Sequence, residues 1–195
     1  MSGKSETDFD NELDTQLMLR VRDGDAQAMD ALVKRHQNTV FATVSGMLKY
    51  GGDVEDIAQQ VFIRIWKNAA SYEPSAKFKT WMFTILRNLV FNEMRRTRRK
   101  PFLSSDALQE EQGIILAHDS SPSPDEQLDL SELAQAVEKA IGELPEREQL
   151  AVNLRRYEQM AYEEIADVLG LSLSATKSIL FRARNKLKEK LDSFL

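Results

Sequence analysis

The sequence of 195 residues suits one ordinary domain or two small ones, and its 42% hydrophobic and 29% charged residues argue against disorder along the whole chain. Because the chain has no cysteine, disulfides, cysteine-based zinc sites and a cysteine nucleophile are excluded, and two histidines far apart argue against a histidine-rich metal site. The net charge of −5 conceals two strongly basic blocks, which point to contacts with a polyanion.

The sequence predicts an all-α, cytoplasmic protein of two small helical domains joined by a flexible acidic linker. Eight glycines and five prolines are few for a chain of many strands and turns. The first 14 residues are acidic and lack the apolar run of a signal peptide. No stretch reaches the roughly 18 apolar residues of a membrane-spanning helix, so no membrane insertion is expected.

Residues 1–100 are predicted to form the first helical domain. Asp25 precedes an amphipathic run that the glycines at 51–52 interrupt, and Asp53 is placed to cap the next helix. A third apolar stripe begins at Phe78 and ends in a cluster of arginines.

The third helix combines aromatic side chains with cations. Between residues 77 and 100, eight basic residues accompany a single acidic residue, Glu93. Aromatic faces, amides and cations together are what single-stranded nucleic acids require. The alternative is that Trp81 and Phe83, at helical spacing, simply belong to the core.

Residues 101–129 are predicted to form an acidic linker. They are rich in serine and proline, and residues 101–133 carry eight acidic and no basic side chains. A second helical domain is predicted over residues 130–195. Its first helix would be capped by Ser131, and Pro145 fits the first turn of the next one.

Residues 162–176 are typical of a helix-turn-helix motif. A short apolar helix ends at Gly170, predicted to be a left-handed C-cap, and Ser174 is expected to cap a long basic helix. The first part of such a second helix reads base edges in the major groove of DNA. An ordinary helical hairpin with a basic outer face is the alternative.

Four segments, in this order, carry a resemblance to one family. Residues 53–66 are similar to the segment with which bacterial sigma factors bind core RNA polymerase, and residues 78–95 to the segment that melts promoters and reads the minus-ten element. Residues 143–148 and 181–187 are similar to region 4 of the same proteins. With only two domains and a linker, the chain resembles the extracytoplasmic-function (ECF) group.

The resemblance implies binding and strand capture, without covalent catalysis or a cofactor. It implies that core RNA polymerase, through the clamp coiled coil of its largest subunit and its flap, is contacted by Asp56, Gln59, Gln60 and Arg64. It implies minus-ten contacts for Phe78, Lys79, Arg87, Asn88, Asn92, Arg95 and Arg96, with Phe78 walling a base pocket. Minus-thirty-five contacts are implied for Thr176, Lys177, Ser178, Phe181, Arg182 and Arg184. Promoter DNA and an anti-sigma factor are the other implied partners.

The sequence departs from the family pattern at three places. Gln60 stands where an acidic residue is common, Ala175 and Thr176 replace the usual Thr-Val pair, and Ile179 replaces a common arginine. The two differences in the recognition helix concern the minus-thirty-five sequence that is read, not the mode of binding.

Two other functions are less compatible with the sequence. A stand-alone helix-turn-helix regulator would explain residues 130–191 but would leave the aromatic and basic third helix without a task. An enzyme is disfavoured because the residues at 3–5 that resemble a phosphate-binding loop lack the required upstream glycine and strand, and no other site-forming motif occurs.

Overall fold

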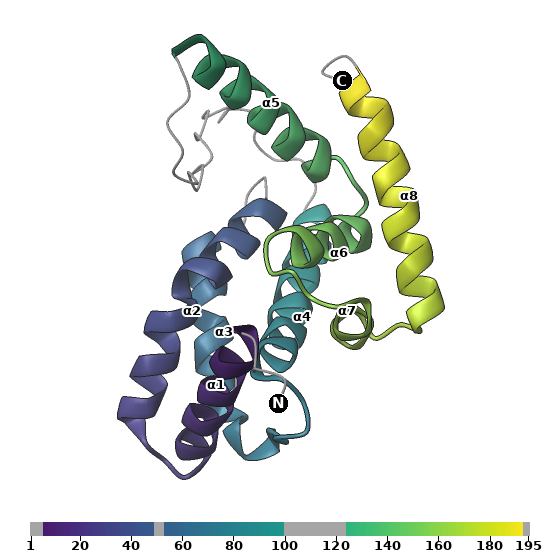
Figure 1. Cartoon of the computed structure of the whole chain (residues 1–195). Helices are drawn as coiled ribbons and strands as arrows, with labels where there is room; N and C mark the ends of the chain where they lie inside the picture. The colour runs from purple at the N-terminus through teal and green to yellow at the C-terminus, as the bar shows by residue number, and fades with distance from the viewer. Residues whose placement is uncertain (1–5, 49–52, 100–123, 193–195) are drawn as a thin grey trace, which may run out of the picture.

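The computed structural model describes residues 6–48, 53–99 and 124–192. Over these ranges the chain forms eight α-helices and one short 3-10 helix, with no strand (Figure 1). The all-α prediction is confirmed. Within the same ranges, none of the helices combines the length and apolar character that crossing a membrane requires.

The N-terminal unit, residues 6–99, consists of the first four α-helices. In chain order they are α1 (Glu6–Arg22), α2 (Ala26–Met47), α3 (Val54–Lys67) and α4 (Phe78–Arg99), with the 3-10 helix η1 (Ala69–Ser71) before α4. Two predicted caps are confirmed, since Asp25 accepts from the amides of Gln27 and Ala28, and Asp53 accepts from the amide of Asp56. Helix α1 packs on α2, and the sequence interpretation did not include it.

The C-terminal unit, residues 124–192, contains α5 (Pro124–Gly142), α6 (Glu146–Arg156), α7 (Tyr162–Leu169) and α8 (Leu173–Leu191). Gly170 has φ of 65°, so the left-handed C-cap is confirmed. The prediction that Ser174 caps α8 is wrong, because the side chain that accepts from the amide of Ala175 belongs to Ser172. Helix α5 begins at Pro124, before the predicted start at Ser131. Of the predicted linker 101–129, residues 124–129 are therefore helical and the others lie outside the described residues.

The two units pack directly on each other, which the sequence did not predict. Helix α4 lies against α7, and α2 contacts α6 (Figure 1). One continuous apolar cluster includes Leu86 and Val90 of α4 together with Leu154 of α6 and Val168 of α7, all with fully buried side chains. The hydrophobic core thus extends through the boundary between the units.

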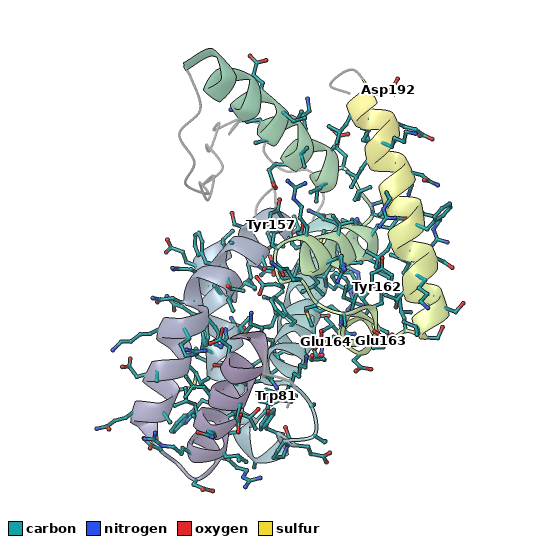
Figure 2. All side chains as sticks on the ribbon, viewed as in Figure 1. Trp81, Tyr157, Tyr162, Glu163, Glu164 and Asp192 are labelled. Carbon is teal, nitrogen blue, oxygen red and sulfur yellow. The ribbon has the colours of Figure 1, made fainter. Side chains whose placement is uncertain are left out.

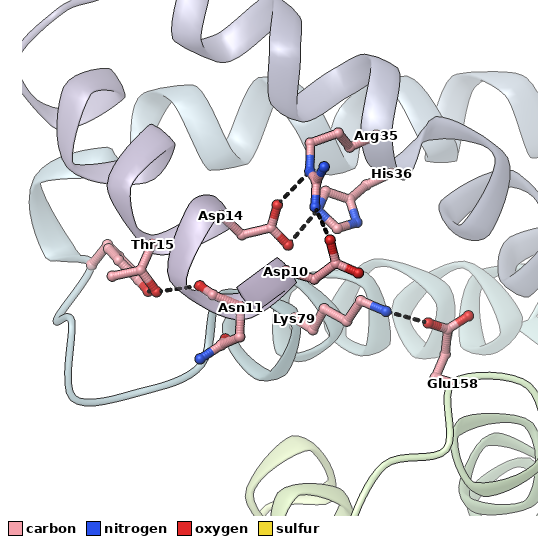
Figure 3. Close-up of polar contacts among 9 residues, drawn as sticks. Asp10, Asn11, Asp14, Thr15, Arg35, His36, Lys79 and Glu158 are labelled. Carbon is pink, nitrogen blue, oxygen red and sulfur yellow. Dashed lines mark hydrogen bonds and ion pairs between the residues drawn. The ribbon is translucent and has the colours of Figure 1, made fainter. Parts of the chain in front are cut away.

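A buried ionic cluster joins α1 to α2 (Figure 3). Asp14 pairs with Nε2 of His36 at 2.9 Å and accepts from Nε of Arg35 at 2.7 Å, while Arg35 also donates to Asp10 at 3.0 Å. Burial opposes ionisation of Asp14, but the hydrogen bonds and charges of His36 and Arg35 outweigh it and lower the pKa of Asp14 below 3.8. The cluster also contacts the start of α4, because the ring centroid of His36 lies 5.2 Å from that of Phe78.

Candidate nucleic-acid interface

Helix α4 separates an apolar face from a polar one. Phe78, Met82, Phe83, Leu86 and Val90 are fully buried, and they recur at the spacing of one helical face. The opposite face carries exposed side chains predicted to contact the minus-ten element: Asn88, Asn92, Arg95 and Arg96. The apolar spacing therefore fixes which side of α4 is available to a nucleic acid.

Two asparagines on the exposed face of α4 are each held by an arginine. Arg87 donates to the side-chain oxygen of Asn88 from Nε at 3.2 Å and from Nη2 at 2.7 Å, and Arg95 donates to the side-chain oxygen of Asn92. With the oxygens engaged, the amide N–H groups of Asn88 and Asn92 are the donors that these exposed side chains can offer. Such donors suit the acceptor atoms on an unpaired base edge.

The prediction for Phe78 needs correction. Its side chain is fully buried between the rings of His36, Tyr72 and Trp81, so it fills the core of the N-terminal unit and does not wall an open pocket. Trp81 is half-buried and its ring lies 5.4 Å from that of Tyr72, as expected of a core residue.

Two of the predicted minus-ten residues lie in the contact between the units. Lys79 pairs with Glu158 across 3.2 Å (Figure 3). Arg87 donates from Nη1 to the carbonyl of Val168, in the last turn of α7. Burial lowers the pKa of Arg87, and the nearby charge of Arg147 lowers it further. The structure thus separates Lys79 and Arg87, which pair with the C-terminal unit, from the exposed members Asn88, Asn92, Arg95 and Arg96.

Helix α8 presents the predicted minus-thirty-five residues. Ile179, Leu180 and Ala183 bury one face of the helix against the rest of the motif. The opposite side exposes Lys177, Ser178, Phe181, Arg182 and Arg184. The ring of Phe181 is 61% exposed, an unusual position for a large apolar side chain and one suited to contact with a base or its methyl group.

The prediction for Thr176 is wrong. Its side chain has no exposed surface, and its hydroxyl donates to the carbonyl of Ser172 at 3.1 Å. Thr176 therefore stabilises the first turn of α8 from the inside and does not face DNA.

Helix α3 carries a third candidate surface. The four residues predicted to bind core RNA polymerase, Asp56, Gln59, Gln60 and Arg64, are all exposed. Ile63 is 48% exposed and Trp66 43% exposed. Because both are exposed, this face of α3 carries apolar as well as polar side chains, which is typical of a protein-binding surface.

An open groove lies between the end of α4, the start of α6 and the middle of α8. It is lined by Arg98, Arg147 and Arg182 together with Glu146 and Glu148. Arg98 pairs with Glu146 across 2.8 Å, and Arg182 lies 3.6 Å from Glu148. Cations from both candidate DNA-binding helices thus meet acidic side chains of α6.

Comparison with known proteins agrees with this arrangement. Residues 32–100 match the family model of sigma-70 region 2, and residues 134–187 match that of sigma-70 region 4. The ECF RNA polymerase sigma-E factor of Escherichia coli K12 is 34% identical over 93% of this chain and 96% of its own length. The corresponding factor of Haemophilus influenzae is 30% identical over 93% of this chain and 97% of its own length.

Two solved structures are also similar. CnrH, in complex with the cytosolic domain of CnrY, has a TM-score of 0.64 and 25% identity over 93% of this chain and 98% of its own. RpoE of Bartonella quintana, in complex with the anti-sigma factor NepR, has a TM-score of 0.63 and 25% identity over 84% of this chain and 96% of its own. With matches to both regions, in order and along nearly the whole length of its relatives, the chain belongs to the extracytoplasmic-function family of RNA polymerase sigma factors.

Proposed function

We propose that this sigma factor directs core RNA polymerase to promoters whose minus-ten element is read by α4 and whose minus-thirty-five element is read by α8. The observation that carries the proposal is that both helices are amphipathic, with asparagines and cations on the exposed face of α4 and cations with Phe181 on that of α8. A stand-alone regulator is not favoured, because the family likeness includes region 2.

On α4 the function is strand capture. Unstacking a base step costs a few kcal/mol, so a protein that opens DNA needs groups that bind the released strand. Asn88 and Asn92 supply donors for base edges, and Arg95 and Arg96 supply cations for phosphates. No covalent step is involved, and we assign no enzymatic activity.

On α8 the function is duplex recognition. Lys177, Ser178 and Arg182 lie on the exposed side of the first three turns, the part of a recognition helix that enters the major groove. A lysine or arginine there donates to O6 and N7 of guanine. Phe181 and Arg184 complete this surface.

The surface of α3 is assigned to core RNA polymerase, with the clamp coiled coil of the largest subunit as its partner and the flap as partner of the C-terminal unit. Ile63 and Trp66 supply apolar area, and Asp56, Gln59, Gln60 and Arg64 supply polar contacts around it. This assignment places the protein in the cytoplasm, where polymerase acts. An anti-sigma factor is a further proposed partner, by analogy with NepR bound to RpoE of Bartonella quintana.

Reconstitution tests the proposal. The purified chain is mixed with core RNA polymerase, and transcription from fragmented genomic DNA is mapped by sequencing the transcripts. We expect start sites downstream of a shared pair of promoter elements.

Trp66→Ala should weaken core binding by about 2 kcal/mol, the usual cost of truncating an interface hot spot. Leu13→Ala, which truncates a side chain 42% exposed on α1, should not weaken it. Absence of any start site that depends on the chain would refute the proposed function.

A further inference from the structure

Helix α4, drawn with its side chains in Figure 2, carries five arginines between residues 87 and 99, and three of them bond to acceptors of α4 itself. Two of these acceptors are the side-chain oxygens of Asn88 and Asn92, both of which are exposed. Arg96 bonds instead to the carboxylate of Glu93, at 2.8 and 2.7 Å. The asparagines therefore offer a different set of free groups from that of an asparagine without an arginine partner.

The side-chain oxygen of Asn88 is fully engaged. It accepts from Nε of Arg87 at 3.2 Å and from Nη2 at 2.7 Å, and an amide oxygen has two lone pairs. The third nitrogen of Arg87, Nη1, donates to the carbonyl of Val168, so the whole guanidinium is held in place. Because a guanidinium has donors only, the atom of Asn88 that faces it is the oxygen, and the two amide N–H groups remain for a base.

Asn92 repeats the arrangement one turn further along α4. Nη2 of Arg95 donates to its side-chain oxygen, and Nε of Arg95 donates to the carbonyl of Phe91 at 3.3 Å. Both bonds lie within α4, so they do not depend on the position of the C-terminal unit. Hydrogen bonds from a charged donor are about twice as strong as neutral ones, so the pair opposes rotation of the Asn92 amide.

An amide that offers only donors distinguishes bases by the acceptors on their edges. An asparagine free to offer both groups matches adenine, because it donates to N7 and accepts from the N6 amino group. An asparagine whose oxygen is occupied would set its own N–H groups against that amino group. It matches two adjacent acceptors instead. These are O6 and N7 of guanine, which a single lysine nitrogen also contacts together, or O2 and N3 on the Watson–Crick edge of an unpaired cytosine.

We propose that Arg87 and Arg95 are positioning residues that set the base specificity of α4. They hold Asn88 and Asn92 as donors, which select guanine or cytosine and reject adenine. This inference rests on the proposed reading of the minus-ten element by α4. Cβ atoms four residues apart on a helix are separated by about 5–6 Å, less than two stacked base steps of about 3.4 Å each. The two selected bases therefore lie within one short stretch of the minus-ten element.

Base substitution locates the two positions. Holoenzyme made from the chain and core RNA polymerase is titrated with fluorescent single-stranded DNA that carries the minus-ten element defined by start-site mapping, with each base placed in turn at each position. Asn88→Ala and Asn92→Ala identify the positions that these residues read, because each variant removes the base preference there. At both positions wild-type holoenzyme should bind guanine or cytosine at least about fivefold more tightly than adenine, the lower end of what one bidentate contact supplies. A preference for adenine, or no preference that either variant removes, would overturn the inference.

The amino group of adenine provides a test of sign that needs no change in the protein. Unsubstituted purine in place of adenine keeps the acceptors N1 and N7 but lacks the N6 amino group. If the asparagines offer donors only, removing this group removes two opposed donors, and purine should bind at least about threefold more tightly than adenine at the same position. If an asparagine oxygen accepted from the amino group, purine would bind more weakly than adenine, and that result would refute the inference.

Arg87→Met and Arg95→Met release the asparagine oxygens. Methionine keeps an unbranched side chain of high helix propensity but has no N–H donor. With the oxygen free, the amide can present both of its groups, so the preference over adenine at the corresponding position should fall to within about twofold.

Arg96→Met and Arg98→Met are the matched controls. Arg96 bonds to Glu93, and Arg98, which contacts the C-terminal unit as Arg87 does, bonds to Glu146. Losing a phosphate contact weakens binding to all bases alike, so both controls should keep the wild-type base preference. A uniform loss for all four variants, with preference unchanged, would make Arg87 and Arg95 ordinary cations and contradict the inference. The purine comparison uses wild-type protein, so it decides the question even if a variant does not fold.

Transcription separates this inference from the proposed function. If start sites depend on the wild-type chain while purine binds more weakly than adenine, the proposed function stands and only the assigned base specificity is refuted. If no start site depends on the chain, the proposed function fails whatever the base preferences are.

Discussion

Asn88 lies on the exposed side of α4, with its side-chain oxygen accepting from Arg87. Asn88→Ala should leave folding and core binding intact but impair opening of promoters, by about 1–3 kcal/mol where a base contact is lost. Permanganate footprinting of thymines in the opened region measures the defect directly. It should depend on one base of the minus-ten element and shrink on a pre-melted template.

Asn38→Ala on α2 is the matched control, since Asn38 is also an exposed helical asparagine. Normal opening by Asn88→Ala protein on every promoter would remove Asn88 from base recognition and leave α4 with a purely electrostatic role.

Asp14 gives a second prediction at the scale of one residue. Because the pKa of Asp14 is lower in the folded than in the unfolded protein, its contribution to stability is present above the ordinary pKa and lost as pH falls through the folded value. Asp14→Asn should therefore lower the free energy of unfolding near pH 7 by about 1.5–3 kcal/mol, the usual value of hydrogen bonds to charged groups. The difference from wild type should stay constant down to about pH 5 and narrow below pH 4.

Urea denaturation over that pH range provides the measurement, with Asp30→Asn as control. Asp30 pairs with Lys34 on the exposed surface of α2, where ion pairs contribute little. A difference for Asp14→Asn that does not change between pH 7 and pH 3 would show that the ionised carboxylate is not what stabilises α1 on α2.

At the scale of the helix, α8 separates base contacts from general attraction. Arg182→Ala and Lys177→Ala should weaken different promoters unequally, by about 1–3 kcal/mol where a guanine contact is lost. Lys188→Ala, near the end of the same helix, should weaken all promoters alike and reduce the salt slope by less than about one. Binding of holoenzyme to a set of minus-thirty-five variants distinguishes the two patterns, and a uniform loss for Arg182→Ala would make it a phosphate contact.

Helix periodicity also explains which elements the sequence predicted. Helices α2, α3 and α4 have clear apolar stripes, and Asp25 and Asp53 mark two of their starts, so their existence followed from local patterns. Helix α1 could not be predicted from a local pattern, because its stabilising contacts with α2 include Asp14, whose partner His36 is 22 positions away. Ser172 and Ser174 both stand at the start of α8, and only the folded geometry shows that Ser172 is the cap.

The candidate site was predicted by residue type more reliably than by exposure. Asn88, Asn92, Arg95 and Arg96 are exposed as a nucleic-acid surface requires, whereas Phe78 and Thr176 share their helices with those surfaces but point inward. Trp66, within residues 53–66, is a large aromatic side chain that remains 43% exposed. A motif gives no direction for a side chain at the edge of a helical stripe, because neighbouring helices decide what is covered.

At the scale of the whole molecule, the shared core predicts joint unfolding of the two units. Leu154 and Val168 belong to the same apolar cluster as Leu86 and Val90, so separating the units exposes apolar surface on both sides. Calorimetry of the unbound wild-type chain should give a single unfolding transition. Glu158→Lys should give either two transitions or one broader transition, beginning at a lower temperature than in the wild type. Two well-separated transitions in the wild type would show that the units fold independently.

The packing of the units was not available from the sequence, because the contacts that make it join residues distant in the chain. Gln149 donates to the carbonyl of Gly46 at 2.6 Å across 103 positions, and Lys79 reaches Glu158 across 79. Neither pair has a local pattern, and an acidic linker between two motifs is as compatible with separate units as with packed ones.

Gly170 combines two requirements that limit how this sequence can drift during evolution. Its φ of 65° makes the turn between α7 and α8, and a Cβ there would lie 3.3 Å from Nη1 of Arg87. A replacement therefore strains the turn between α7 and α8 and crowds the side chain of Arg87 at the same time. Glu158 does not combine two requirements in this way, because its one described contact is the ion pair with Lys79. Selection acting on Glu158 can therefore adjust how firmly the two units pack while the turn of the helix-turn-helix motif stays unchanged.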